Sequence, residues 1–151
     1  MKLNVTKDIL EAMIIYGDDS PELEVCGALV GKSDESSYTC TEFIPLTNRS
    51  NKNKAVHYIP DQNEFFNVLK RTSHFDSNSK LDLVGIFHTH PHHAPIPSET
   101  DILGAGYAGI YVIYSPKLKE IKSYYYDGQE NTRFFSPSNI LTINKGQTYD
   151  A

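Results

Sequence analysis

Residues 81–90 read LDLVGIFHTH, a strongly apolar run that ends in two histidines, and this run decides the fold. Its composition predicts a buried strand at the centre of a sheet. Because successive side chains of a strand point to opposite faces, His88 and His90 are expected to lie on the same face. The sequence therefore predicts a central strand that presents two imidazole rings at its carboxyl end.

Shorter runs on both sides supply partners for the central strand. EVCGALVG at residues 24–31 is too brief for a helix and predicts a buried strand, and SYTCTEFIPL at 37–46 alternates and predicts a strand paired with it. Residues 47–54, TNRSNKNK, are polar and have no apolar anchor, which predicts a mobile excursion. Further strands are expected at 56–59, 109–115, 120–126 and 132–136.

Helical spacing and capping residues define the remaining elements. Helices are expected at residues 7–16, at 61–74 and from Ser98 onward, with Thr6 and Asp61 as caps of the first two. This mixture predicts one α/β or α+β domain, in which a central mixed β-sheet is flanked by helices. The domain is expected to span residues 1–137, followed by a C-terminal tail at 138–151, of which residues 144–151 have little to bury.

Composition excludes several classes of function. The formal net charge of -5 is spread over scattered groups, so no basic stripe predicts a nucleic-acid partner. No apolar run reaches the length of a membrane span, and the first residues lack the apolar core of a signal peptide. The chain is therefore expected to be cytoplasmic, with Cys26 and Cys40 as reduced thiols.

The histidine pair is the first candidate for a functional site. A lone histidine such as His57 or His74 is most often a satisfied structural residue, but two imidazoles on one face of a strand can start a zinc site. Asp101 lies just beyond a proline-rich loop and can supply a third ligand. Two histidines and one aspartate leave a fourth tetrahedral position to water, which is the arrangement of a catalytic zinc.

One feature of this region also has an interpretation that needs no metal. Ser98 and Asp101 match the S-x-x-D pattern of a capping box, so they could simply begin a helix. Peptide hydrolysis also needs a group that takes a proton from water, and Glu24 heads a buried strand. Spacing alone does not choose Glu24 over Glu22, whereas Glu35 and Glu42 resemble solvated charges.

Together these residues carry a resemblance to a known family. The run HTHP at 88–91, followed by Ser98 and Asp101 and preceded by EVCGALVG at 24–31, resembles the JAMM motif of the MPN-plus metalloproteases. The resemblance covers nearly the whole domain. It implies a compact microbial-type MPN/JAMM metalloprotease domain with a cytidine-deaminase-like three-layer arrangement.

Carried over position by position, the resemblance implies a role for each residue of the motif. His88, His90 and Asp101 would bind one zinc ion together with a water. Ser98 would stabilise the oxyanion, and Glu24 would act as general acid and base. Thr89 replaces the more frequent serine, with its side chain expected on the opposite face. His92 and His93 follow the motif directly, and a role for them in or near the site stays open.

The resemblance also implies a substrate. It predicts a peptidase or isopeptidase that cleaves after the C-terminal glycines of a ubiquitin-like modifier or of a sulfur-carrier protein. The short connection after Asp101 lacks the insertion with which larger members grip ubiquitin chains. An extended substrate tail would bind in a groove beside a sheet edge. Residues 48–54 are candidates to line this groove. Cys26 and Gly27 either line it too or pack the core.

Two other hypotheses of function remain at this stage. A non-catalytic MPN-type scaffold would normally have lost a ligand, and a zinc hydrolase of small molecules is the second alternative. Deaminase chemistry does not fit, because the chain has neither the H-x-E nor the C-x-x-C of that signature. The sequence also leaves a homodimer open.

Overall fold

In the computed structural model, which describes residues 1–129 and 135–144, the strands form one closed, barrel-like sheet. Across these described residues the order around the sheet is β1-β3-β2-β4-β5-β6-β7, and β1 pairs in parallel with both β3 and β7. The strands are β1 (Lys2–Thr6), β2 (Cys26–Ser33), β3 (Ser37–Leu46), β4 (Asp82–Thr89), β5 (Gly109–Ser115), β6 (Glu120–Tyr126) and β7 (Phe135–Ile143).

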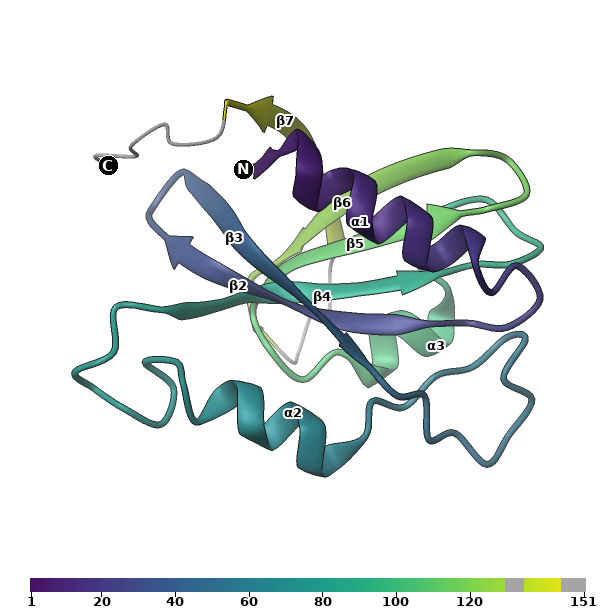
Figure 1. Cartoon of the computed structure of the whole chain (residues 1–151), viewed down its shortest axis with the longest axis horizontal. Coiled ribbons are helices and arrows are strands. Elements are labelled where there is room, and N and C mark those ends of the chain that lie inside the picture. Colours follow the sequence, from purple (N-terminus) through teal and green to yellow (C-terminus); the bar gives the residue numbers. More distant parts are fainter. Residues whose placement is uncertain (130–134, 145–151) are drawn as a thin grey trace.

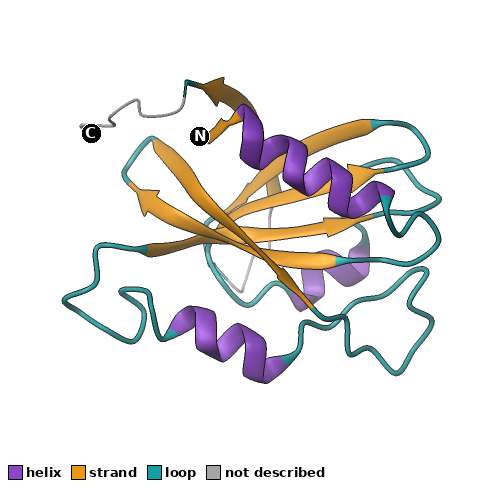
Figure 2. Ribbon diagram, in the orientation of Figure 1, coloured by secondary structure: helices purple, strands orange, loops and turns teal. Residues whose placement is uncertain are grey.

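The helices lie on both sides of this sheet. They are α1 (Lys7–Asp18), α2 (Gln62–Leu69) and α3 (Glu99–Gly104). The purple helix α1 crosses the front of the sheet in Figure 1, whereas α3 lies behind it and α2 runs below. Figure 2 shows the same division between the central strands and the peripheral helices and loops. Among the described helices, none is long and apolar enough to cross a membrane.

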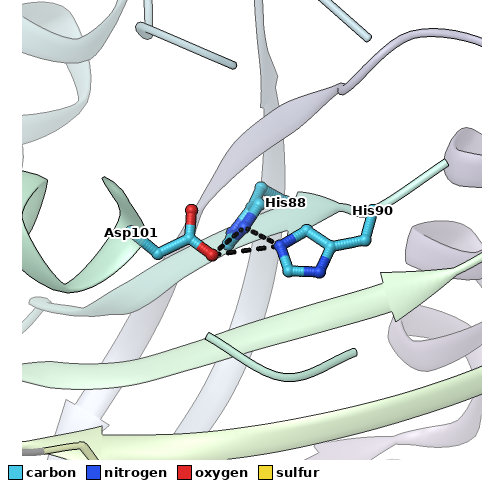
Figure 3. Close-up of side chains that lie close together, drawn as sticks. All are labelled: His88, His90 and Asp101. Atoms are coloured by element: carbon cyan, nitrogen blue, oxygen red, sulfur yellow. Dashed lines mark hydrogen bonds and ion pairs between the residues drawn. The ribbon is translucent and has the colours of Figure 1, made fainter. Parts of the chain in front are cut away.

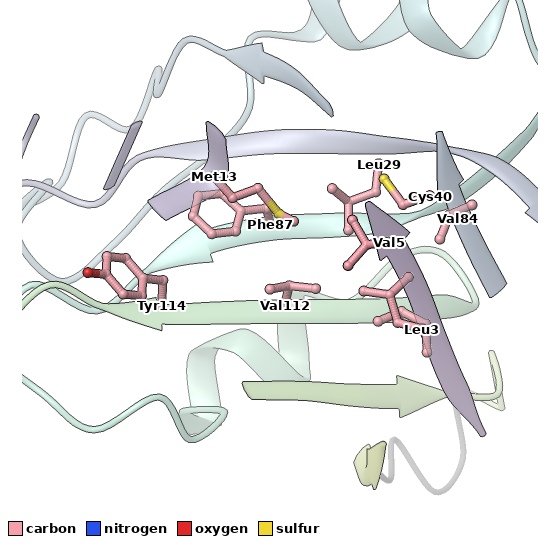
Figure 4. Packing of buried hydrophobic residues seen from close by; sticks show 10 residues of the cluster. Leu3, Val5, Met13, Leu29, Cys40, Val84, Phe87, Val112 and Tyr114 are labelled. Atoms are coloured by element: carbon pink, nitrogen blue, oxygen red, sulfur yellow. The ribbon is translucent and has the colours of Figure 1, made fainter. Parts of the chain in front are cut away.

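Strands β4 and β5 are buried on both faces, which explains their nearly continuous apolar sequence. On the α1 side, Leu3, Val5, Met13, Phe87 and Tyr114 belong to one core cluster, drawn in Figure 4. On the other side, separate clusters pack beneath α2 and α3, and Ile86 belongs to one of them. Adjacent residues of β4 therefore face opposite cores, and this alternation determines where its last residues point.

The expected mixed α+β fold is confirmed, with β4 between β2 and β5 in the sheet. The three-layer arrangement is not confirmed, because the pairing of β1 with β7 closes the sheet on itself. β1 was not predicted at all. Of the strand expected at 132–136, residues 132–134 lie outside the described part of the chain. The domain boundary at residue 137 stays a prediction, and β7 spans it, pairing with β1 through Ile143.

The segment between β3 and α2 differs most from expectation. Residues 56–59 form turn and irregular structure rather than a strand. The only strand-like pairing here is an isolated β-bridge between Asn48 and Pro60 among the described residues. The polar segment expected to be mobile, residues 47–54, is also held by contacts. Arg49 N donates to Ile59 O at 2.7 Å, and Ser50 is buried. The second helix is shorter than expected and ends at Leu69.

Candidate metal centre

The two histidines at the end of β4 converge on one point. Their Nε2 atoms lie 3.1 Å apart, and the side chains point toward each other in Figure 3. Both residues are buried, His88 being 1% and His90 6% exposed. Thr89 between them points to the α1 side, because its Oγ1 accepts from Val25 N at 3.0 Å and its methyl group faces Gly17. The two histidines therefore lie on one face of the strand, as predicted.

Asp101, in the first turn of α3, completes the cluster. Its Oδ2 lies 3.0 Å from His90 Nε2 and 3.2 Å from His88 Nε2. The same oxygen accepts from Ser98 N at 2.9 Å, and Asp101 N donates to Ser98 Oγ at 3.1 Å, so the capping box is present. The cap and the convergence on the histidines are thus compatible, since the cap fixes the direction of the Asp101 side chain.

Hydrogen bonding determines which nitrogen of His90 is free. Its Nδ1 lies 2.9 Å from Ala94 O, and because a carbonyl can only accept, Nδ1 carries the proton. In the neutral ring, Nε2 therefore keeps its lone pair and aims it at His88 and Asp101. A backbone carbonyl that holds the outer nitrogen of a histidine in this way is the usual support of a metal ligand.

The electrostatics of the cluster favour a bound cation. Burial lowers the pKa of His88, so its neutral, metal-binding form is favoured. Burial opposes the charge on Asp101, but His88, His90 and the Ser98 N–H outweigh burial and hold the pKa of that carboxyl well below its usual range. A carboxylate and two nitrogens thus meet at contact distance, and such a group is stable only with a proton or a metal ion between its members.

The donor set fits zinc. Nitrogen and carboxylate oxygen are ordinary zinc ligands, and three ligand atoms bound about 2.0–2.1 Å from a tetrahedral ion lie about 3.3–3.4 Å apart. The three separations here, 3.0, 3.1 and 3.2 Å, are only slightly smaller. Within the described residues, this is the group of histidine, cysteine and acidic side chains whose ligand atoms lie close enough to hold a metal.

Glu24 lies beside this cluster. β2 and β4 are antiparallel with Cys26 opposite His88, and Thr89 N donates to Val25 O at 3.1 Å, so the same register places Glu24 opposite His90. Glu24 is 6% exposed, and its Oε1 is buried without a hydrogen-bond partner among the described residues. The pKa of Glu24 is raised to about 8, mainly by burial; the charge of His90 opposes this increase, and the charge of Asp101 adds to it.

The other candidate residues lie in different environments. Ser98 is exposed, and its hydroxyl oxygen accepts from Asp101 N, which leaves its proton free to donate. Glu22 is exposed, and one of its oxygens lies 3.4 Å from Nε2 of His92, which also is exposed. His93 is exposed as well. Burial and position therefore separate Glu24 from Glu22, which spacing in the sequence did not.

Cys26 and Gly27 are packing residues. Both are buried, and Cys26 Sγ lies 3.6 Å from Leu46 O. A Cβ atom on Gly27 would lie 2.3 Å from the ring of Phe43, so this glycine allows close packing of β2 on β3. Cys26 and Cys40 are free thiols, as expected. Residues 48–54, also expected to line a groove, are not among the residues that line the cleft next to Asp101, whereas residues 56–60 of the same loop do line it.

Two residues of that loop make contacts at the site that were not predicted from the sequence. The ring of Tyr58 stacks on His88, with centroids 4.5 Å apart and an interplanar angle of 24°. The side chain of Asn48 donates to the backbone carbonyl of Glu24 at 3.0 Å. An asparagine two residues before a serine, at the start of a polar segment, is a turn signal that could have identified Asn48. No local signal places Tyr58 over His88.

A cleft opens next to Asp101. It has a volume of about 390 Å³ and lies between the loop after β3, α2 and α3. Its lining is mostly apolar and aromatic, and includes Tyr58, Ile59, Phe65, Tyr107 and Tyr111. Asp101 of the cluster therefore borders an apolar cleft.

Fold and site together define a JAB-type domain, and comparison with known proteins agrees. Residues 6–127 match the family model of prokaryotic homologs of the JAB domain, so the chain belongs to this family. A desampylase of Haloferax volcanii is 31% identical over 120 residues, which cover 76% of this chain and 81% of that protein. A desampylase of Pyrococcus furiosus is 35% identical over 85 residues, which cover 56% of this chain and 54% of that protein. The resemblance to the JAMM family is confirmed.

Solved structures agree on the fold. The solution structure of a protein from Desulfitobacterium hafniense has a TM-score of 0.75 and 22% identity, covering 95% of this chain and 94% of that one. A solution structure from Salinibacter ruber has a TM-score of 0.65 and 24% identity, covering 98% and 96%. At these identities the likeness concerns the fold alone.

Proposed function

We propose that this protein is a zinc-dependent metallopeptidase or isopeptidase that cleaves after the C-terminal glycines of a ubiquitin-like modifier or sulfur-carrier protein. The observation that carries the proposal is the convergence of His88, His90 and Asp101, with the buried carboxyl of Glu24 directly beside them. The desampylase relatives support deconjugation of a ubiquitin-like modifier as the type of reaction.

In this proposal each residue of the site has a separate role. His88, His90 and Asp101 hold the metal, which when bound lowers the pKa of a water to about 7 and polarises the scissile carbonyl. Glu24 takes a proton from the attacking water and passes it to the leaving amine. The Ser98 hydroxyl donates to the oxygen of the carbonyl as negative charge develops there.

The surroundings of Glu24 suit this role. A carboxyl whose pKa is raised toward neutrality by burial can both accept and release a proton near neutral pH, which is what an acid and base in successive steps requires. Its Oε1 has no hydrogen-bond partner among the described residues, so the oxygen is available for a water.

The apolar cleft suits an extended substrate. Two terminal glycines let a peptide backbone approach a buried metal closely, because they carry no Cβ atoms. The residues before them can lie along the apolar and aromatic lining between the loop after β3 and α3. A globular protein substrate with a flexible glycine-ended tail therefore fits better than a small molecule.

The test compares three variants with the wild type. Zinc content is measured together with cleavage of a ubiquitin-like protein that carries a C-terminal extension. Asp101→Asn should lose the metal and the activity, whereas Glu24→Gln should keep about one zinc per chain and lose roughly 10²–10⁴-fold in rate. Glu22→Gln, two residues away and exposed, is the matched control and should behave as the wild type.

The result that would overturn the proposal is a folded wild-type protein that binds no zinc and cleaves nothing after zinc is added. That result would favour the non-catalytic scaffold. Equal loss of activity in Glu22→Gln and Glu24→Gln would instead remove Glu24 from its role.

A further inference from the structure

The side chain of Asn48 connects three segments around the site. Its Nδ2 donates to the carbonyls of Glu24 and His57, both at 3.0 Å. Its Oδ1 accepts from Ser50 N at 3.0 Å and from Ile59 N at 3.1 Å. A primary amide has two N–H donors and two acceptor lone pairs, so these contacts use its full capacity.

These contacts act on two residues of the centre. At Glu24, Asn48 fixes the carbonyl while Glu24 N donates to Lys54 O at 2.7 Å, so the same loop holds both backbone groups of the residue. At Tyr58, Asn48 bonds the residues immediately before and after it, His57 O and Ile59 N. The ring between these two anchors is the one that stacks on His88.

We propose that Asn48 is a positioning residue that orients the acid and base Glu24 and, through Tyr58, the metal ligand His88. The inference rests on the proposed function, since it assigns Asn48 to the same reaction. Asn48 does not touch the ligand cluster. It holds the backbone of Glu24, which lies beside the cluster, and the segment of Tyr58, whose ring stacks on His88. A displacement of the base by a fraction of an ångström is enough to slow proton transfer.

A conservative substitution tests the hydrogen bonds donated by the Asn48 side chain separately from those it accepts. Asn48→Asp keeps the oxygen that accepts from Ser50 N and Ile59 N, so the loop retains these two bonds. It removes both donated bonds and places a carboxylate against the carbonyls of Glu24 and His57. Asn48→Ala removes all of these contacts together.

The matched control is Arg49→Gln. Arg49 Nε lies 2.8 Å from Asp61 Oδ2 at the base of the same loop, so this variant loosens the loop without touching Glu24 or Tyr58. Each protein is assayed for kcat and KM, for zinc affinity by chelator competition, and for amide hydrogen exchange of Glu24 in the metal-free state. The last two measurements do not depend on activity.

The expected results differ between the variants. Asn48→Asp should lower kcat about 10–100-fold, the usual effect of losing a support of a metal site, with KM changed less than about threefold. Exchange at Glu24 should be faster, and zinc affinity should fall about tenfold in Asn48→Ala. Arg49→Gln should stay within about twofold of the wild type in all three, as expected for a surface ion pair.

Three outcomes would overturn the inference. One is a folded Asn48→Asp with wild-type kcat, and another is a loss that appears only in KM or equally in Arg49→Gln. If both Asn48 variants fail to fold, exchange of the Asn48 side-chain amide protons in the wild type decides, because rapid exchange would contradict the bonds to Glu24 and His57. A wild type that lacks zinc and cleavage would contradict the proposed function instead, and the exchange data would still test the bonds.

Discussion

Glu24 illustrates at the residue scale how a proposed catalytic group costs stability. Burial, assisted by the charge of Asp101 and opposed by His90, raises its pKa from 4.5 to about 8 in the metal-free protein. Below the lower value the carboxyl is neutral in both states, so its contribution to folding is fully present there. As pH rises from 4.5 toward 8, the unfolded chain ionises first, and folding loses stability across this window.

Glu24→Gln should therefore change the pH dependence of stability. Gln cannot ionise, so the variant should gain stability relative to the metal-free wild type as pH rises through this window, by on the order of a few kcal/mol, and the gain should level off above it. Urea unfolding in the presence of a chelator measures the difference at each pH. Two stability curves that run parallel from acidic to alkaline pH would contradict a raised pKa at Glu24.

At the same scale, those residues of the candidate site that lie close together in the sequence could be predicted from their spacing. Alternation along one strand was enough to place His88 and His90 together, and the position of Asp101 in a capping box was enough to suggest a fixed carboxylate near them. Spacing did not choose Glu24 over Glu22; the family resemblance did, and the register between β2 and β4 places Glu24 opposite His90. Tyr58 reaches His88 only through tertiary packing, which no local pattern encodes.

At the scale of elements, the strands that were missed or wrongly predicted depend on distant partners. β1 has only Leu3 and Val5 as buried residues, and its pairing with β3 and β7 joins segments far apart in the sequence. The segment at 56–59 alternates like a strand, but the side chain of Asn48 bonds its backbone where a neighbouring strand would otherwise do so. β4 was predictable because burial on both faces leaves a continuous apolar run.

The contact between β4 and β5 provides a prediction at this scale. Gly85 pairs with Ile110, and a Cβ atom on Gly85 would lie 1.6 Å from the Ile110 carbonyl oxygen. Gly85→Ala must push these strands apart and should lower the free energy of unfolding by about 3 kcal/mol or more. Gly104→Ala is the control, because nothing lies within 4 Å of its added Cβ, and its change should stay within about 1 kcal/mol. Similar unfolding curves for the two variants would contradict the close approach.

At the scale of the whole molecule, the candidate centre joins parts that the chain builds separately. His88 and His90 come from the carboxyl end of β4, whereas Asp101 comes from a short helix reached through the proline-rich loop. Glu24 enters from the segment before β2, and the loop after β3 supports it. A ligand that bridges β4 and α3 therefore stabilises the arrangement of the entire fold and not only of one element.

Zinc should accordingly raise the unfolding temperature. A ligand that binds only the folded state contributes about 2.7 kcal/mol at a free concentration of 100 times its Kd, which corresponds to roughly 5–10 °C for a domain of this size. Thermal unfolding followed by circular dichroism, with zinc and with chelator, measures the shift. Asp101→Asn should show little of it, and magnesium should not replace zinc, since magnesium prefers an all-oxygen environment. An equal shift in the wild type and in Asp101→Asn would mean that zinc binds elsewhere on the chain, and the bridge between β4 and α3 would then have no role in holding it.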